Sequence, residues 1–225
     1  MIRSDEEIKV DIIDQLEWDD RVDASDISAT VDNGVVSLRG SVPTWLTRSA
    51  AYADAWAVDG VIDVQNALRI EPPRVNSPED DAELKRHAEM ILGFHPDVDE
   101  RRASAEVEDG VVTLSGSVDA YWKKLNAEEA VSNIGGVVDI RNNLTVVPRQ
   151  TALDETIAGQ VEAALRRRPL VEAQDIDVQV EGGVVRLSGE VATWAARRSA
   201  RDAALHTPGV VDVRDRIRIR PPVVT

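Results

Sequence analysis

The chain contains the same seven-residue string three times. It reads GVVSLRG, GVVTLSG and GVVRLSG at Gly34–Gly40, Gly110–Gly116 and Gly183–Gly189. A second glycine, followed by two Val or Ile residues and an Asp, stands 20 residues after each string, at Gly60, Gly136 and Gly209. Because this spacing contains no insertion, the 225 residues are predicted to form three copies of one small unit, over residues 1–73, 79–148 and 152–222.

Each copy has the pattern of a helix, two strands, a helix and a strand. In the first copy, Ile8, Ile12 and Leu16 recur at the spacing of one helix face. Apolar and polar residues alternate over residues 27–32, and Asn33-Gly34 favours a tight hairpin before a returning strand at residues 35–42. The predicted fold class is therefore α+β: three tandem αββαβ units, each a small three-stranded mixed sheet with two helices on one face.

Each unit is expected to have its own hydrophobic core. A domain of about 70 residues buries only roughly 60% of its unfolded surface and is marginally stable alone. We therefore expect neighbouring units to contact one another.

Nine recurring glycines are predicted to have structural roles. Three supply positive φ in hairpin turns, at Gly34, Gly110 and Gly183. Three interrupt the returning strand, which indicates a bulge or a closely packed helix, at Gly40, Gly116 and Gly189. Three are expected to be left-handed C-terminal caps of the second helix, at Gly60, Gly136 and Gly209.

The αββαβ order, the hairpin string and the endings Gly60–Leu68 and Gly136–Leu144 together resemble the BON domain. The third copy departs from this pattern, with Asp215 where the others carry Asn66 and Asn142. The resemblance implies a non-enzymatic module associated with envelope stress and osmotic protection, with phospholipid binding proposed for some members of the family. It also implies a bacterial source and, in the usual family context, the periplasm.

The sequence offers little material for catalysis or metal binding. The three histidines, His87, His95 and His206, do not occupy equivalent positions, and the chain has no Cys. Asp63, Asp139 and Asp212 do recur, but an Asp at the entry to a strand more often accepts backbone N–H groups. No nucleophile elbow, phosphate loop or dinucleotide motif is found. We predict that the protein is not an enzyme and uses no cofactor or metal.

Charge is distributed unevenly over the three copies. The net charge is −15, which argues against nucleic-acid binding. Residues 1–73 carry 6 basic and 15 acidic side chains, residues 74–148 carry 8 and 15, and residues 149–225 carry 12 and 11. The third copy is thus the cationic one. Its candidate binding surface comprises Arg166, Arg167, Arg168, Trp194, Arg197, Arg198, Arg201, Arg214, Arg216, Arg218 and Arg220.

The last four of these arginines alternate along the final strand, so they are expected to share the open face of the sheet. Two interpretations are open for them. They could pair across strands with acidic residues of the same face, at Asp175, Asp177 and Glu181. They could instead form a docking face for an acidic partner, including the first two copies of the same or another chain.

Aromatic residues also recur at equivalent positions. Trp45, Tyr121 and Trp194 each stand five residues after the strand glycine, and Trp18 and Phe94 each stand at the end of a first helix. The simpler interpretation is that these rings cover the edge of a small core. The alternative is an amphipathic rim for a bilayer or a partner protein. Trp56 has no aromatic counterpart and is expected either in local packing or in an exposed contact.

The sequence therefore predicts a non-catalytic binding or structural module that acts through its surfaces. The alternatives are peripheral binding of anionic phospholipid by the third unit, and self-association of the acidic units with the basic one. No apolar run is long enough for an integral membrane segment, and no signal peptide is seen at Met1. We expect a cytoplasmic protein, or a periplasmic one if the chain is a processed form.

Overall fold

The computed structural model describes residues 3–71, 81–94, 103–149 and 152–220. The linkers between the copies, His95 and the outer ends of the predicted units fall partly or wholly outside these ranges.

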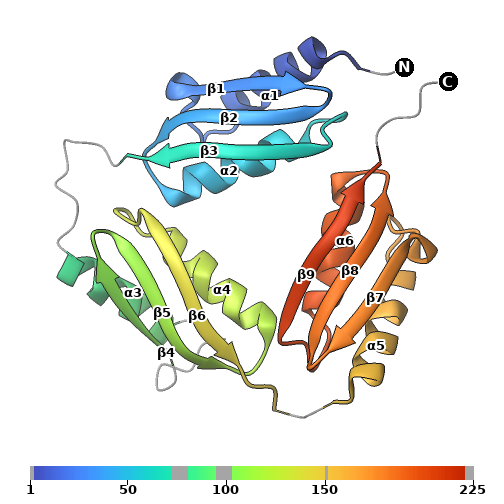
Figure 1. Cartoon of the computed structure of the whole chain (residues 1–225). Helices are drawn as coiled ribbons and strands as arrows, with labels where there is room; N and C mark the ends of the chain where they lie inside the picture. The colour runs from blue at the N-terminus through green and yellow to red at the C-terminus, as the bar shows by residue number, and fades with distance from the viewer. Residues whose placement is uncertain (1–2, 72–80, 95–102, 150–151, 221–225) are drawn as a thin grey trace.

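The first repeat consists of α1 (Asp5–Trp18), β1 (Ile27–Asp32), β2 (Val35–Val42), α2 (Trp45–Ala57) and β3 (Asp63–Ile70). The second consists of α3 (Asp81–Phe94), β4 (Ala103–Glu108), β5 (Val111–Val118), α4 (Tyr121–Ser132) and β6 (Asp139–Val146). The third consists of α5 (Asp154–Arg166), β7 (Ile176–Glu181), β8 (Val184–Val191), α6 (Trp194–Leu205) and β9 (Asp212–Ile219) (Figure 1).

Each repeat has one three-stranded mixed sheet, ordered β1-β2-β3, β4-β5-β6 and β7-β8-β9. The middle strand pairs antiparallel with the strand before it and parallel with the strand after the second helix. The register is the same in all three sheets, since Ile27, Ala103 and Ile176 face Gly40, Gly116 and Gly189 respectively. This architecture confirms the predicted α+β class and the αββαβ order.

A carboxylate at the start of each first helix fixes the hairpin turn. Asp5 accepts hydrogen bonds from the backbone N–H groups of Asn33 and Gly34, at 2.8 and 2.9 Å. Asp81 does the same for Asp109 and Gly110, and Asp154 for Gly182 and Gly183. The two turn residues both have positive φ, as the hairpin string predicts. The sequence pattern alone does not reveal this tertiary role of the three Asp residues.

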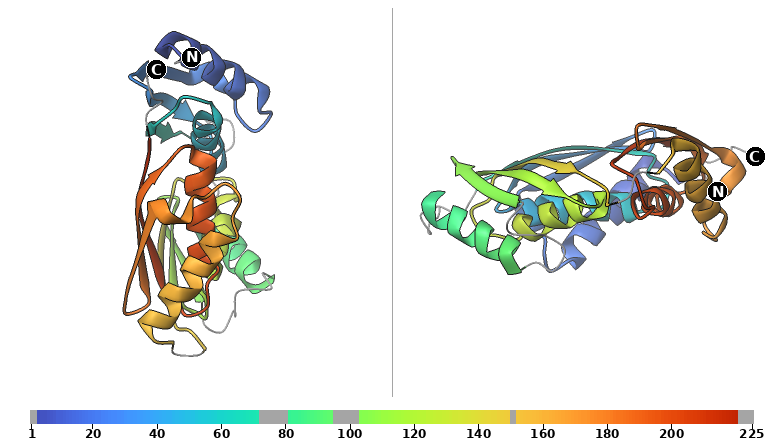
Figure 2. Two further views of the ribbon diagram at one scale, coloured as in Figure 1. Left: turned by 90° about the vertical axis from the view of Figure 1, so that its right-hand side faces the viewer. Right: turned by 90° about the horizontal axis from the view of Figure 1, so that it is seen from below.

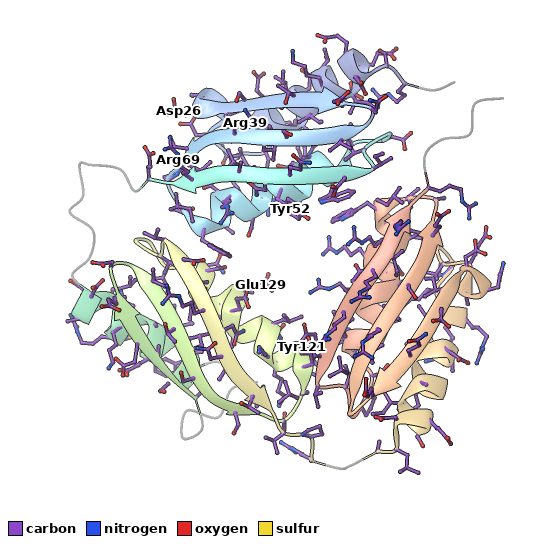
Figure 3. The ribbon with its side chains drawn as sticks, in the orientation of Figure 1. Asp26, Arg39, Tyr52, Arg69, Tyr121 and Glu129 are labelled. Atoms are coloured by element: carbon purple, nitrogen blue, oxygen red, sulfur yellow. The ribbon has the colours of Figure 1, made fainter. Side chains whose placement is uncertain are left out.

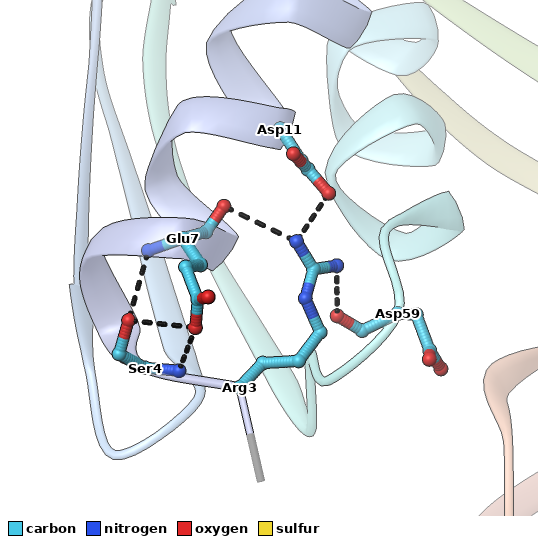
Figure 4. A network of polar contacts seen from close by, with 5 residues as sticks. All are labelled: Arg3, Ser4, Glu7, Asp11 and Asp59. Atoms are coloured by element: carbon cyan, nitrogen blue, oxygen red, sulfur yellow. Dashed lines mark hydrogen bonds and ion pairs between the residues drawn. The ribbon is translucent and has the colours of Figure 1, made fainter. Parts of the chain in front are cut away.

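A local network of polar contacts holds the residues around the beginning of α1 (Figure 4). Ser4 and Glu7 form a capping box at the beginning of α1. Arg3 donates to the carbonyl oxygen of Asp59 at 3.0 Å and pairs with Asp11. These contacts join the N-terminal end of α1 to the loop that leads into β3.

The strand glycines are required for a different reason from the one predicted. The register of β1 and β2 runs through Gly40 without an extra residue, so there is no bulge. A Cβ on Gly40 would lie 1.9 Å from the carbonyl oxygen of Asp26, and a Cβ on Gly189 would lie 2.0 Å from that of Asp175. The close neighbour is therefore the backbone of the short 3-10 turn before the first strand, not a helix.

The third set of glycines is also displaced from its predicted place. Gly60, Gly136 and Gly209 do have positive φ, of 97°, 93° and 87°. However, α2 ends at Ala57 and its cap residue is Val58, so Gly60 belongs to a separate turn closed by Val61 N–H and the Val58 carbonyl. The prediction of positive φ is confirmed, while the prediction of a helix cap is wrong.

The three repeats are arranged as a ring with two layers. The sheets lie on one side of the molecule and the helices on the other (Figure 2). The strands β3, β6 and β9 lie on the inner side of the ring, and β1, β4 and β7 on the outer side (Figure 1). Each repeat has a core between its helices and its sheet, with Leu38, Leu114 and Leu187 fully buried at equivalent positions. The cores of the first and third repeats are continuous, which corrects the expectation of three separate interiors.

Candidate binding surfaces

The arginines of the last strand form an exposed row. We call Arg214, Arg216, Arg218 and Arg220 the arginine face. All four are exposed, while the alternating Val213, Ile217 and Ile219 are buried and Asp215 is half-buried. The alternation predicted from the sequence is therefore confirmed, and these side chains lie on the side of β9 opposite to the core.

Half of the arginine face has no partner within the described part of the chain. Arg214 lies 3.7 Å from Asp212 of its own strand, and Arg220 lies 3.3 Å from Asp175 and 3.7 Å from Glu190. Arg216 and Arg218 make no hydrogen bond or ion pair with the residues that the structure describes. Two guanidinium groups thus remain available to an external anion.

The predicted cross-strand pairing is found only for Asp175. The strand β8 separates β7 from β9, so acidic side chains of β7 do not reach the arginines of β9. Instead, Asp177 accepts a hydrogen bond from Gln179, and Glu181 pairs with Arg186 of β8 at 3.0 Å. The order of strands in the sheet explains why the pairing interpretation fails for Asp177 and Glu181.

The arginines of α6 contact aromatic rings and a neighbouring repeat. Arg197 pairs with Asp215 at 2.9 Å, and its guanidinium lies 5.8 Å from the centre of the Trp56 ring of the first repeat. Arg198 lies 5.4 Å from the ring of Trp194. Arg197 is consequently engaged in contacts within the molecule, and α6 offers fewer free cations than the sequence suggested.

The residue that departs from the family pattern positions Arg197. In the first repeat, Asn66 donates to the carbonyl oxygen of Arg48 at 3.3 Å and accepts from the N–H of Leu68. In the third repeat, Asp215 accepts from the N–H of Ile217 but cannot donate, and it pairs with the Arg197 side chain instead. The change from Asn to Asp therefore converts a link to the helix backbone into an ion pair with a helix side chain.

The first and third repeats meet at what we call the Trp56–Trp194 joint, formed by Trp56, Trp194 and Arg197. The two indole rings are stacked, with centroids 6.3 Å apart and an angle of 11° between planes. Trp56 is only 3% exposed. The choice between local packing and an exposed contact is thus resolved, since Trp56 packs against another repeat.

The joint also contains an unsatisfied polar group. The indole N–H of Trp56 is buried without a hydrogen-bond partner. An aromatic pair contributes roughly 0.5–1.5 kcal/mol beyond its buried area, and a cation–π contact about 0.5–2 kcal/mol. An unpaired buried donor costs roughly 1–3 kcal/mol. These opposing contributions are similar in size, so polar and aromatic terms together make the joint only weakly favourable.

The other two contacts between repeats also involve the start of a second helix. Tyr121 is 8% exposed and belongs to the hydrophobic cluster of the third repeat, where Figure 3 shows the second repeat meeting the third. Burial raises the pKa of Tyr121, and the nearby Asp212 carboxylate adds to this effect. Its neighbour Trp122 lies 6.4 Å from the ring of His206. Trp45 of the first repeat packs against the core of the second.

In each contact, the start of one second helix therefore meets the next repeat around the ring. At two of the contacts the surface met is the end of that repeat's own second helix, at Trp56 and at His206. The prediction that the rings cover core edges is wrong for Trp18 and Phe94, which are 81% and 84% exposed. For Trp45, Tyr121 and Trp194 the rings connect repeats, an interpretation that the sequence supported only as a contact with an unspecified partner.

A pocket of about 420 Å³ lies between the second and third repeats. Its wall includes Trp122, His206 and Asp119, and Asp119 pairs with both Lys123 at 3.0 Å and Arg149 at 2.5 Å. These partners hold the pKa of Asp119 below its ordinary value. Because the two cations share one carboxylate, the charged wall is largely satisfied by its own residues.

A pair of acidic residues in the first repeat was not singled out from the sequence. Hydrogen bonds from Arg21 lower the pKa of Asp19 to about 2. Asp54 of α2 is 6% exposed, and burial together with the Asp19 carboxylate raises its pKa. One Asp54 oxygen accepts from Gln15 at 3.4 Å and the other has no partner. The signal in the sequence was an Asp among the small residues of a helix face.

The described residues contain no cluster of three or more His, Cys, Asp or Glu side chains able to hold a metal ion. Asp63 and Asp212 accept the N–H of the following residue at 2.9 Å, as the turn interpretation predicted. Among the helices described, none is long and apolar enough to cross a bilayer.

Comparisons with known proteins agree with the repeated fold. The BON domain model matches residues 4–72, 80–148 and 153–221. The "Osmotically-inducible protein Y" of Escherichia coli (strain K12) is 30% identical over 128 residues, which cover 56% of this chain and 64% of that protein. This match thus spans less than two thirds of the Escherichia coli relative. An "Uncharacterized protein in gshII 5'region" of Anaplasma centrale is 25% identical over 122 residues, covering 52% of this chain and 81% of that protein.

Matches to solved structures are distant. The C-terminal domain of CdsD, described as the structural protein of the type III secretion system of Chlamydia trachomatis, aligns with a TM-score of 0.27 and 14% identity, covering 95% of this chain and 96% of that chain. The PrgH periplasmic domain aligns with a TM-score of 0.22 and 14% identity, covering 92% and 99%. TM-scores this low carry no argument about function.

Proposed function

Because this chain belongs to the BON domain family, with three tandem domains that fill nearly all of its length, we propose that it is a non-catalytic binding module of the osmotic stress response. The name of the Escherichia coli relative supports the connection with osmotic stress.

We place the principal docking surface at the arginine face of the third domain, and we propose an acidic segment of a partner protein as its ligand. The observation that carries this proposal is the pair of exposed guanidinium groups on Arg216 and Arg218 that have no partner among the described residues. Arginine binds carboxylates in a bidentate manner, which favours an acidic peptide over a neutral one.

The proposal is tested by titrating the full chain with a labelled polyglutamate peptide at low salt and following fluorescence anisotropy. The double variant Arg216→Glu/Arg218→Glu is expected to bind at least about tenfold more weakly, which corresponds to roughly 1.4 kcal/mol. The matched control is Arg39→Glu/Arg141→Glu, which changes the net charge equally at two exposed arginines of the other sheets. Equal weakening in both variants would show that only overall charge matters and would refute the assigned surface.

A second candidate ligand is an anionic membrane surface. The supporting observation is the layered shape, in which all three sheets lie on one side of the ring (Figure 2). Such a side can approach a bilayer while the arginine face contacts lipid headgroups, each cation contributing about 1 kcal/mol near an anionic surface. Arg167 and Arg168, at the end of α5, are exposed as well and supply a second set of cations.

Vesicle flotation separates the two ligands. Vesicles of phosphatidylglycerol and phosphatidylcholine should retain the chain at low salt, pure phosphatidylcholine vesicles should not, and Arg216→Glu/Arg218→Glu should abolish retention if lipid is bound. An absence of flotation with anionic vesicles at low salt would eliminate the membrane candidate and leave the acidic peptide.

A further inference from the structure

The contact between the first and third domains is the closing contact of the ring. The first and second domains are joined directly along the chain, as are the second and third, whereas the first and third are connected only through the second. The stacked rings of Trp56 and Trp194, with Arg197 beside them, lie at this contact.

The two halves of this contact are different surfaces of one chain. The first domain contributes the end of α2, with Trp56 and the ring of Tyr52 against its edge at 6.3 Å. The third domain contributes the start of α6, with Trp194 and Arg197. A contact of this head-to-tail kind can be made within one chain or between two chains, since the same pair of surfaces is present in every copy.

The chemistry of the two halves also favours association between copies. Trp, Tyr and Arg are the residue types that dominate binding energy at protein interfaces. The first domain carries a net charge of −9 over residues 1–73, and residues 149–225 carry +1, so the domains that meet at this contact do not repel each other as two acidic domains would. The buried N–H of Trp56 has no hydrogen-bond partner, which lowers the stability of the closed contact.

We propose that the Trp56–Trp194 joint is a self-association surface of this protein, closed within the monomer and able to bind the corresponding surface of a second copy. In the exchanged form, the Trp194 surface of one chain docks on the Trp56 surface of another. The inference goes beyond the proposed ligand-binding role, because it involves α2 and α6 and leaves the arginine face free.

Within one chain, the two domains experience an effective concentration of the order of millimolar, typical of linked modules. We therefore expect the wild-type protein to be monomeric at micromolar concentration. Contacts between two chains become dominant when no chain can form the joint within itself. One chain must then still supply an intact Trp56 surface and another an intact Trp194 surface.

Two single variants make this condition available. Trp194→Ala removes the third-domain half, and Trp56→Leu removes the first-domain half with a residue that already stands at the equivalent position of the third repeat, Leu205. Neither variant alone contains a complete joint, within a chain or between chains. An equimolar mixture contains one complete joint per pair of chains, between the intact Trp194 of one variant and the intact Trp56 of the other.

Analytical ultracentrifugation of the full-length variants provides the test. Each variant alone should sediment as a monomer, while the mass of the mixture should approach twice the monomer mass as the concentration rises toward millimolar. The matched negative control mixes Trp56→Leu with the double variant Trp56→Leu/Trp194→Ala, which provides no complete joint and should remain monomeric.

A mixture that stays monomeric at millimolar concentration would overturn the proposal, and so would dimers in either variant alone. If Trp56→Leu lowers the urea midpoint of unfolding, Tyr52→Glu replaces it, because this ring is 39% exposed and lies against the edge of Trp56. The arginine-face variants bear only on the ligand proposal, so failure of one proposal is distinguishable from failure of the other.

Discussion

Replacing Gly189 by Ala is expected to be among the most destabilising single-methyl additions in the third domain. Gly189 has φ of 140°, a region that costs other residues about 1–3 kcal/mol. In addition, a Cβ would lie 2.0 Å from the Asp175 carbonyl oxygen, and this neighbour is backbone that cannot rotate away. The sum predicts a loss of at least about 3 kcal/mol in the free energy of unfolding.

Two other glycines of the same domain separate these contributions. Gly182 has φ of 59°, but a Cβ added there would have no atom within 4 Å, so Gly182→Ala should cost only about 1 kcal/mol through backbone strain. Gly159 lies in α5 with no positive φ and open space around it, so Gly159→Ala should stabilise by roughly 0.5–1 kcal/mol.

Urea unfolding of the full-length variants, followed by circular dichroism, measures this series. The expected order of stability is Gly159→Ala, wild type, Gly182→Ala and then Gly189→Ala. If Gly189→Ala proved no less stable than Gly182→Ala, the close backbone approach would not be the reason for a glycine in the strand.

Three further predictions concern polar residues. Asp54→Asn should stabilise the first domain by roughly 1–2 kcal/mol at neutral pH, because the folded state raises the pKa of this carboxyl and so disfavours its ionised form. The gain should shrink below about pH 4, where Asp54 is protonated in the unfolded chain as well. If urea midpoints showed the same gain at every pH, burial of the charge would not be its cause. Asp154→Ala removes the acceptor for the Gly182 and Gly183 N–H groups and should lower the free energy of unfolding in urea by about 1–2 kcal/mol. The control Glu155→Ala, at the next residue, should change it by less than about 0.5 kcal/mol. Equal effects of the two variants would show that both residues act through the helix dipole instead. Asp215→Asn releases Arg197 from its ion pair and should reduce the circular-dichroism exciton signal of the stacked Trp56 and Trp194. The stability of the domain should change by no more than about 1 kcal/mol. An unchanged exciton signal would show that Arg197 does not support the stacking.

The fold of each repeat was predictable because its signals are local. The hairpin residues Asn33 and Gly34 have the positive φ that their types favour, and the alternating arginines of β9 face away from the core as the strand period requires. The reason for Gly40 was not predictable, because its close neighbour is the carbonyl oxygen of Asp26, whose position depends on the folded 3-10 turn.

The periodicity of apolar residues could not predict the contacts between repeats. Trp56 and Trp194 are separated by more than half of the chain, and nothing in the pattern of one repeat states which surface of another it meets. The available signals were the recurrence of Trp45, Tyr121 and Trp194 and the exception of Trp56, which together indicated contacts without naming partners. The interpretation that the arginines of the last strand pair with Asp177 and Glu181 failed for a similar reason, since strand order decides which charges can meet.

Small-angle X-ray scattering of the full-length protein at low concentration is the decisive test of the closed three-domain ring. We expect a wild-type profile that matches the ring, an unchanged radius of gyration for Trp18→Ala, whose ring is exposed, and a larger radius for Trp194→Ala. A wild-type profile already as extended as that of Trp194→Ala would contradict the ring and, with it, the role given to the Trp56–Trp194 joint.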